Sequence, residues 1–304
     1  MAEMFAESLH GLLPLEGTHA RRCEDAALWA ELEGIGLFGI GREEAAGGAG
    51  LGAAEEALIA MELGRRLVSP SVLATIGAAH ARPCQGGDPV AGVRVAAGWR
   101  RANGMVLVYD ADARLVLVRS ESAASVHELP PHSEPVDAEL WHAELLACEE
   151  PGPEVARLDA AGLARLRLND AAALAGIAAL ALELAVAYAG ERRQFGRPIG
   201  SFQAIKHHCA NMAIAARNAR DQVGFASVAI DQARPDAAFQ ADCALLVAAD
   251  AALGNASTNI QVHGGIGFSE EAMPHLLLKR ARLLQAIAGG RESTLARIAA
   301  ASTT

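Results

Sequence analysis

No two cysteines in this chain of 304 residues stand at the C-x-x-C spacing that is typical of zinc sites and redox motifs. The five cysteines are odd in number and widely separated, which argues against a disulfide framework and favours a reducing cytoplasm. No positioned base accompanies any of them, so we expect all five to be buried structural residues rather than nucleophiles. They are Cys23, Cys84, Cys148, Cys209 and Cys243.

The chain also has few basic residues. Lysine and arginine number 26 against 36 acidic residues, which gives a net charge of −10 at pH 7. No basic stripe dominates, and this argues against a general surface for nucleic acid or for an anionic membrane. A local basic spot for a phosphate-bearing ligand is compatible with the same balance.

A secretory signal and a strongly apolar run are missing as well. Residues 1–12 contain acids and no basic segment ahead of an apolar core. Residues 171–189 are nearly all apolar, but they are mostly alanine and include Gly176 and Glu183. A membrane span needs about 20 strongly apolar residues. We therefore expect a buried helix of a soluble, cytoplasmic protein, with no membrane span.

The chain divides into three regions of different composition. Its 52% hydrophobic residues suffice for a sizeable core. Residues 1–82 have a helical pattern, with helices expected over 23–37 and 53–67 on either side of a glycine-rich break. Residues 83–155 form a region of short β-prone runs. Residues 156–304 return to long helical segments. No internal repeat is evident.

The middle region predicts a small β domain. Its β-prone runs are residues 93–95, 105–109 and 115–118, bounded by proline and glycine. The turns at Asn103-Gly104 and at residues 110–112 suit antiparallel strands, and Asn103-Gly104 is suited to close a two-residue hairpin.

The last region predicts an antiparallel helix bundle, because long helices with short connections pack in this way. The first helix should end at Gly190, a residue typical of the C-terminal cap. The next should begin near Ser201 as its N-cap. The expected helices are residues 171–190, 201–233, 236–260, 270–288 and 291–300, with a glycine turn at 264–267. The fold class is thus mainly α with a small β domain.

The first of two informative motifs is ERRQFGRPI at residues 191–199, followed by SFQ at 201–203. Arg192 ends a helix before a turn that a glycine and a proline impose, and its guanidinium suits the two negative charges of a pyrophosphate. Phe195 can cover a flat ring, and Gln203 can both donate and accept hydrogen bonds. In an isolated motif, a solvated helix terminus would be the favoured interpretation.

The second motif is QVHGGIGF at residues 261–268. Gly264 and Gly265 let the backbone approach phosphate oxygens closely, because no Cβ intervenes. A lone glycine pair is weak evidence, since ordinary turns contain it. Gln261 just before it, together with the arginine motif upstream, makes the combination fairly specific. We expect His263 to contribute its backbone rather than its imidazole.

At this spacing the two motifs resemble the flavin-binding signature of the acyl-CoA dehydrogenase family. The resemblance implies FAD in a site shared across a subunit interface, with Arg192, Phe195 and Gln203 contacting the cofactor of the partner. It also implies an N-terminal helical domain, a middle β domain and a C-terminal bundle, here at residues 1–82, 83–155 and 156–304. The segment that would bind the adenosine half of FAD is Gln261, Val262, His263, Gly264 and Gly265.

The chain departs from the family at the catalytic base. The family's reaction passes a hydride to the flavin while a carboxylate removes the α-proton of an acyl-CoA, so an acid is required. Ala288 stands at the usual glutamate position, and Leu166 stands where the isovaleryl-CoA dehydrogenase branch places its glutamate. Asp170 lies one helical turn beyond Leu166, a displacement of about 6 Å. We assign no catalytic residue to the chain.

The middle region departs from the family in the same direction. The family's Thr-Glu-Pro and Gly-Ser-Asp segments line the flavin ring, and nothing between Pro83 and Pro153 resembles them. The first hypothesis is therefore a short, glutamate-lacking subunit of a bacterial heteromeric acyl-CoA dehydrogenase. The resemblance implies an acyl-CoA substrate, a paralogous partner subunit and an electron-transferring flavoprotein as acceptor; some family members of this kind act on steroid side chains.

Two alternatives stay open. One is a self-sufficient acyl-CoA dehydrogenase, a homodimer for example, whose base is an unrecognised acid such as Asp170. The other is a flavin-free interaction protein on the same fold. The absent base argues against the former, and the intact motifs argue against the latter.

Overall fold

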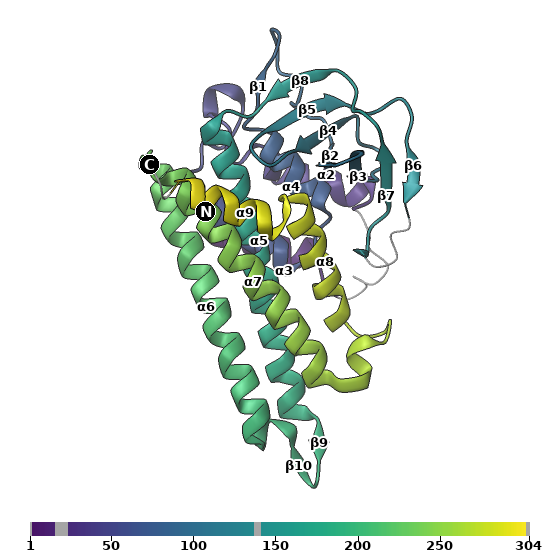
Figure 1. The fold of residues 1–304 in the computed structure, drawn as a ribbon, viewed down its shortest axis with the longest axis vertical. Coiled ribbons are helices and arrows are strands. Elements are labelled where there is room, and N and C mark those ends of the chain that lie inside the picture. Colours follow the sequence, from purple (N-terminus) through teal and green to yellow (C-terminus); the bar gives the residue numbers. More distant parts are fainter. Residues whose placement is uncertain (1, 16–23, 137–140, 302–304) are drawn as a thin grey trace.

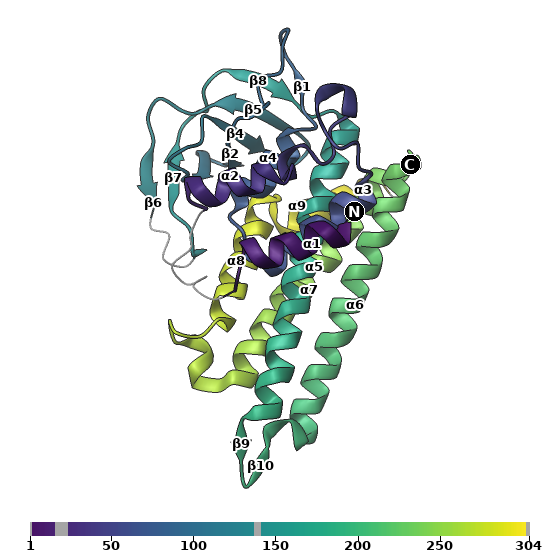
Figure 2. The ribbon, with the colours of Figure 1, turned by 180° about the vertical axis from the view of Figure 1, so that it is seen from behind.

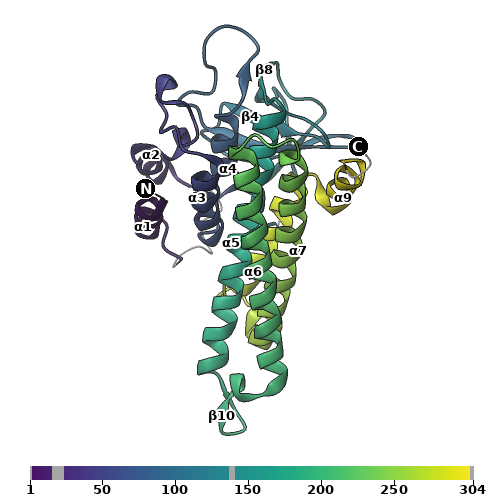
Figure 3. The same ribbon diagram turned by 90° about the vertical axis from the view of Figure 1, so that its left-hand side faces the viewer.

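The computed structural model describes residues 2–15, 24–136 and 141–301, and these form three regions in sequence order (Figure 1). A curved sheet sits at one end of a long helix bundle, and the N-terminal helices lie beside both of them (Figures 2 and 3). The structure confirms the predicted fold class, mainly α with one small sheet.

The N-terminal region is held by side chains that cap its helices. Asp25 accepts a hydrogen bond from the Leu28 amide at 2.8 Å and starts α2, which is shorter than the helix expected over 23–37. Asp231 lies far along the chain and accepts from the first amides of α3, with the Ala53 amide at 2.6 Å. The elements are α1 (Ala2–Leu12), α2 (Ala26–Gly34), η1 (Leu37–Gly39), η2 (Glu44–Ala46), α3 (Ala53–Arg65) and α4 (Pro70–Ala78).

The middle region forms one sheet of eight strands in the order β1-β8-β5-β4-β2-β3-β7-β6. Helix α4 packs against β2, so the sheet buries one face on the N-terminal helices. The strands are β1 (Arg82–Pro83), β2 (Val95–Arg101), β3 (Gly104–Val108), β4 (Leu115–Arg119), β5 (Ala124–Glu128), β6 (Glu134–Val136), β7 (Leu145–Cys148) and β8 (Glu154–Arg157).

Two details of the predicted sheet need correction. The β2–β3 hairpin forms, but Arg101 pairs with Gly104, so Gly104 (φ 104°) begins β3 rather than occupying the loop. The turn at residues 110–112 does not join antiparallel neighbours, because β4 pairs with β2 in parallel. An ion pair between the Arg94 guanidinium and Asp110, at 3.1 Å, stabilises the position of this turn beside the start of β2.

The C-terminal region is the expected helix bundle, but its helix boundaries differ from the prediction in both directions. Helix α5 begins at Ala160 rather than at residue 171, because Asp159 caps it by accepting from the Gly162 amide at 2.9 Å. Ser201 does not cap α6; its hydroxyl donates to the Pro198 carbonyl, and Phe202 holds the cap position. The elements are α5 (Ala160–Glu191), β9 (Arg193–Gln194), β10 (Arg197–Pro198), η4 (Ile199–Ser201), α6 (Gln203–Asp231), α7 (Ala237–His263), η5 (Gly264–Phe268), α8 (Pro274–Ile287) and α9 (Gly290–Ala301).

Two helical segments of the described chain, 160–191 and 237–268, are long and apolar enough to cross a membrane. Both lie in the bundle, where α5 packs against α3, α6 and α7. Of the apolar window of the first segment, 61% is buried inside the protein. Packing within the bundle therefore accounts for the apolar character of α5.

The cysteines are less buried than predicted. Cys84 is exposed because it follows the edge strand β1, and Cys148, Cys209 and Cys243 are partly exposed and free. Cys23 lies outside the described residues. Within residues 2–15, 24–136 and 141–301, no group of three histidine, cysteine or acidic side chains is arranged to hold a metal ion.

The N-terminal region and the bundle meet backbone to backbone. Gly64 of α3 faces the carbonyl of Ala173, and Gly176 of α5 faces the carbonyl of Met61. A Cβ at either glycine would overlap the opposing backbone, which cannot yield as a flexible side chain would. The two glycines therefore set how closely α3 approaches α5.

We expect Gly176→Ala to lower the free energy of unfolding by about 2–3 kcal/mol, because its methyl group would force the two helices apart. Gly190→Ala in the same helix is the matched control, since nothing lies within 4 Å of its added Cβ. That variant should be neutral or more stable by up to about 1 kcal/mol. Urea denaturation measures both. Equal stability of the two variants would contradict this account of the contact.

Candidate functional site

The two sequence motifs meet at the end of the bundle that points away from the sheet (Figure 1). Helices α5 and α7 run in the same direction and pack against each other, so their C-terminal ends lie together. Arg192 follows the end of α5, and Gly264 follows the end of α7. Gln203 begins α6 at this same end. We call this end, residues 188–203 and 259–268, the bundle tip.

A ring stack joins the two motifs. The Tyr188 and His263 rings lie 4.1 Å apart between centroids and 20° from parallel. The Nδ1–H of His263 donates to the Asn259 carbonyl at 2.9 Å, which leaves Nε2 without a proton in the neutral ring. Burial lowers the pKa of His263, against the opposing effect of that hydrogen bond, so the ring is neutral at pH 7. Sequence reasoning assigned no role to Tyr188 or to the imidazole.

The arginine motif forms a small hairpin that projects from the tip. Strands β9 and β10 pair antiparallel, with Gln194 opposite Arg197. The two loop residues, Phe195 and Gly196, both have positive φ, 51° and 77°, as a type I′ turn requires. The Phe195 ring is 92% exposed. A bulky residue held in the left-handed region and in water is typical of a functional site.

Arg192 is also exposed and stands at the base of this hairpin. Its amide donates to the Tyr188 carbonyl at 2.9 Å, and its carbonyl accepts from the Ile199 amide at 2.8 Å, so its backbone is fixed on both sides. Among the described residues, its guanidinium makes no ion pair. A fixed backbone with a free guanidinium suits recognition of a phosphate group from another molecule.

The glutamines and glycines of the motifs differ in what they offer. The side chains of Gln203 and Gln261 are exposed, whereas that of Val262 is 5% exposed and packs in the core. Any contribution of Val262 to a ligand therefore comes from its backbone. Gly264 adopts φ 68° and ψ −144°, a conformation open only to glycine. Its amide already donates to Ile260 and Gln261 carbonyls, while open space surrounds the missing Cβ of Gly264 and of Gly265.

The tip fits one part of a flavin dinucleotide. It presents an exposed guanidinium, an exposed aromatic ring, two exposed amides and two glycines whose Cβ positions face open space. These groups suit a pyrophosphate, a flat ring system and polar ribose or base atoms. The contacts of Arg192, Phe195, Gln203, Gln261, His263, Gly264 and Gly265 with such a ligand remain predictions.

The three positions considered for a catalytic base lie elsewhere. Ala288 follows the end of α8, near the sheet and remote from the tip. Leu166 is 1% exposed and packs against the α4 residue Gly77. Asp170 is 1% exposed and forms an ion pair with Arg119 of β4. Burial raises the pKa of Asp170, and Arg119 opposes this rise. Because Arg119 holds its carboxylate inside the protein, Asp170 is unsuited to reach a substrate.

An open cavity of about 580 Å³ lies between the sheet and the loop that follows α8. It is lined by Gly289 and Gly290, between α8 and α9, and by Arg100, Arg101 and Arg119 from the strands. Glu121, on the turn after β4, is the acid that lines it within the described part of the chain. The sequence gave no indication that Glu121 lines a cavity, because the residue lies in a turn.

Two family models match the chain: "Acyl-CoA dehydrogenase, C-terminal domain" at residues 156–303 and "Acyl-CoA dehydrogenase, N-terminal domain" at residues 3–84. The acyl-CoA dehydrogenase FadE34 of Mycobacterium tuberculosis is 33% identical over 305 residues, which cover 90% of this chain. The acyl-CoA dehydrogenase IpdE2 of the same organism is 33% identical over 273 residues, or 84% of this chain. The chain spans 42% of the length of FadE34 and 80% of the length of IpdE2.

Solved structures of low sequence identity share the fold. A variant of the Tcur3481-Tcur3483 steroid ACAD superposes with a TM-score of 0.82 at 22% identity and covers 100% of this chain and 99% of that chain. The ChsE4-ChsE5 complex from Mycobacterium tuberculosis gives 0.77 at 22% identity, with 98% and 94% covered. Butyryl-CoA dehydrogenase from Megasphaera elsdenii gives 0.76 at 21% identity, with 100% and 98% covered.

The neutral Tyr188–His263 stack predicts a pH dependence of stability. The folded-state pKa of His263 lies below its ordinary value of 6.5. The neutral His263 ring therefore contributes its full stabilisation of the folded state above pH 6.5. This stabilisation is lost as the pH falls from 6.5 through the folded-state pKa, because the unfolded chain binds the proton more readily. We expect the wild type to lose stability relative to His263→Phe, which keeps a ring that does not titrate. Urea denaturation at pH 8, 7, 6 and 5 measures the difference, and parallel curves would contradict it.

Proposed function

Because the chain belongs to the acyl-CoA dehydrogenase family of FAD-dependent oxidoreductases, we propose that it is the glutamate-lacking subunit of a heteromeric acyl-CoA dehydrogenase. In this proposal it supports α,β-dehydrogenation of an acyl-CoA thioester by completing the FAD site of a paralogous partner. The flavin, when bound, accepts the hydride that leaves the acyl chain. The residues of this chain hold and orient the cofactor, and the partner supplies the base.

One geometric observation carries the proposal. The bundle tip and the loop after α8 are at opposite ends of α8, a helix of 14 residues, and hence about 20 Å apart. The groups suited to a flavin dinucleotide thus project away from this chain's own sheet and from Ala288. This arrangement favours a ligand that a second subunit presents to the tip, and it favours association through the C-terminal bundle.

The relatives support the heteromeric form. Two solved neighbours, the Tcur3481-Tcur3483 steroid ACAD and the ChsE4-ChsE5 complex, each carry the names of two different chains. By this analogy the substrate is a bulky acyl-CoA such as a steroid side-chain thioester, and the complex works in the cytoplasm with an electron-transferring flavoprotein as acceptor. A self-sufficient enzyme is the second candidate, and Glu121 beside the cavity is the observation that favours it.

Absorbance spectra of the chain expressed alone and with its paralogous partner test the proposal. Flavin absorbance and acyl-CoA-dependent dye reduction only in the pair are the expected result. A yellow, active lone chain would overturn the proposal in favour of a self-sufficient enzyme. A colourless protein in both preparations would point to a flavin-free interaction protein.

Arg192→Ala should weaken retention of FAD by the assembled pair by roughly 10- to 100-fold, because a charged hydrogen bond to phosphate is lost. Arg217→Ala on α6 is the control; its exposed ion pair with Asp221 contributes little to stability. Flavin content after gel filtration, relative to protein, measures the effect. Full flavin content in the Arg192 variant would show that this residue does not contact the cofactor.

Glu121→Gln should leave the turnover of the pair unchanged, since the proposal assigns the base to the partner. The double variant Arg119→Met with Asp170→Leu removes both charges of the buried ion pair together, so we expect it to fold. It should also keep the turnover of the pair. Stopped-flow flavin reduction by the acyl-CoA measures the chemical step. Loss of reduction with flavin content intact in either variant would assign the base to this chain.

A further inference from the structure

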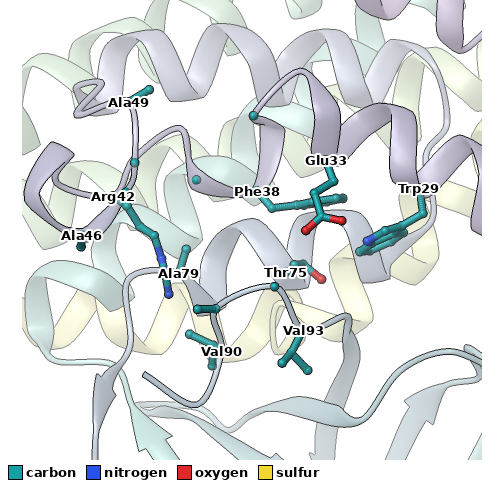
Figure 4. A pocket seen from close by; sticks show the side chains of 16 residues that line it. Trp29, Glu33, Phe38, Arg42, Ala46, Ala49, Thr75, Ala79, Val90 and Val93 are labelled. Carbon is teal, nitrogen blue, oxygen red and sulfur yellow. The ribbon is translucent and has the colours of Figure 1, made fainter. Parts of the chain in front are cut away.

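A cavity of about 510 Å³ lies between the N-terminal helices and the segment that leads into β2 (Figure 4). It is at the sheet end of the molecule, opposite the bundle tip. Its walls come from α2, η1, α4 and residues 90–93. The volume lies in the range of small-molecule sites, and a seam between structural regions is a common place for them.

One wall of this cavity is aromatic. The Trp29 and Phe38 rings stack at 4.4 Å between centroids and 17° from parallel. The Arg94 guanidinium lies 4.0 Å from the Trp29 ring centre and braces it. In a chain with 4% aromatic residues, two rings held at the edge of a cavity form a firm apolar contact surface for a ligand.

Two charged residues line the cavity, and within the described part of the chain Arg42 has an ionic partner whereas the Glu33 carboxylate has none. Arg42 is neutralised by Asp88 at 2.6 Å, and Arg94 is neutralised by Asp110 at 3.1 Å. Glu33 is exposed, and its carboxylate makes no hydrogen bond or ion pair within residues 2–15, 24–136 and 141–301. Its carboxylate extends over the cavity between Phe38 and Trp29 (Figure 4), with Oε1 4.0 Å from the Cβ position of Gly92.

Glycines keep this arrangement open. Gly36 and Gly47 line the cavity in the left-handed conformation, with φ of 78° and 79°. A Cβ at Gly48 would collide with Arg42 and displace it from Asp88. The loop thus preserves both the space and the neutralised arginine at its rim.

We propose that this cavity binds a small organic cation, an ammonium group carried on an apolar or aromatic body. The ammonium pairs with Glu33, and the body packs on Phe38 and the alanine and valine walls. Glu33 repels anions, and the arginines are already paired, so carboxylates and phosphates are excluded. The site is therefore distinct from any surface that receives acyl-CoA or FAD, and it does not depend on the proposed function.

Three probes of nearly equal shape test the proposal on the full chain: benzylamine as the cation, benzyl alcohol as the neutral analogue and benzoate as the anion. Isothermal titration calorimetry at pH 7.5 should rank benzylamine first and benzoate last. Glu33→Gln should weaken benzylamine about three- to fivefold, the effect of one partly exposed charge pair, and leave benzyl alcohol unchanged.

Glu31→Gln is the matched control, because Glu31 is exposed on the same helix α2 and does not line the cavity. It should bind all three probes as the wild type does. Trp29→Phe identifies the site, since the change in tryptophan fluorescence on benzylamine binding should vanish. Equal binding of the three probes, no binding at millimolar concentration, or an equal effect of Glu31→Gln and Glu33→Gln would overturn the proposal.

Discussion

A layer of buried charges along the first half of α5 is the constraint on which the fold depends. Each of these groups would cost several kcal/mol to remove from water alone, so each requires its partner. The partners of α5 come from three different elements, and α5 can satisfy them together in only one rotation and one register. A fourth element, α9, joins the layer through its ion pair with Asp242. These ion pairs and hydrogen bonds thereby fix the positions of four elements relative to α5, namely α3, β4, α7 and α9. The groups are Glu56 with Arg165 and Asn169, Asp170 with Arg119, and Asp242 with Arg167 and Arg297.

The other half of α5 carries this alignment to the bundle tip. Its buried side chains are apolar. Asn255 of α7 donates to the carbonyls of Ala178 and Met212, 3.0 Å each, which ties three helices together at mid-length. The Tyr188–His263 stack then closes the end. Arg192 and Gly264 are therefore positioned by rigid helices rather than by loops, as a binding site for an extended ligand requires.

Sequence patterns located most helices, because apolar periodicity and glycine breaks are local properties. They missed the first turns of α5, since Arg165, Arg167, Asn169 and Asp170 look like solvent-exposed residues until their partners are known. They also missed the parallel pairing of β2 and β4, which is accompanied by the Arg94–Asp110 ion pair, a contact that no turn motif encodes. The two motifs of the tip were recognisable because each is a short backbone conformation with characteristic residues. The ring stack between them was not, because it joins helices that are distant in sequence.

The approach of α3 to α5 has a consequence for how relatives of this chain can exchange parts. Gly64 and Gly176 meet carbonyl groups rather than side chains, so the contact has no packing that could be remodelled by compensating substitutions. A recombinant joining the N-terminal helices of one relative to the bundle of another keeps its fit only if both parents carry a glycine on each helix at this crossing. The two glycines must therefore be inherited together, although more than one hundred residues separate them in the sequence.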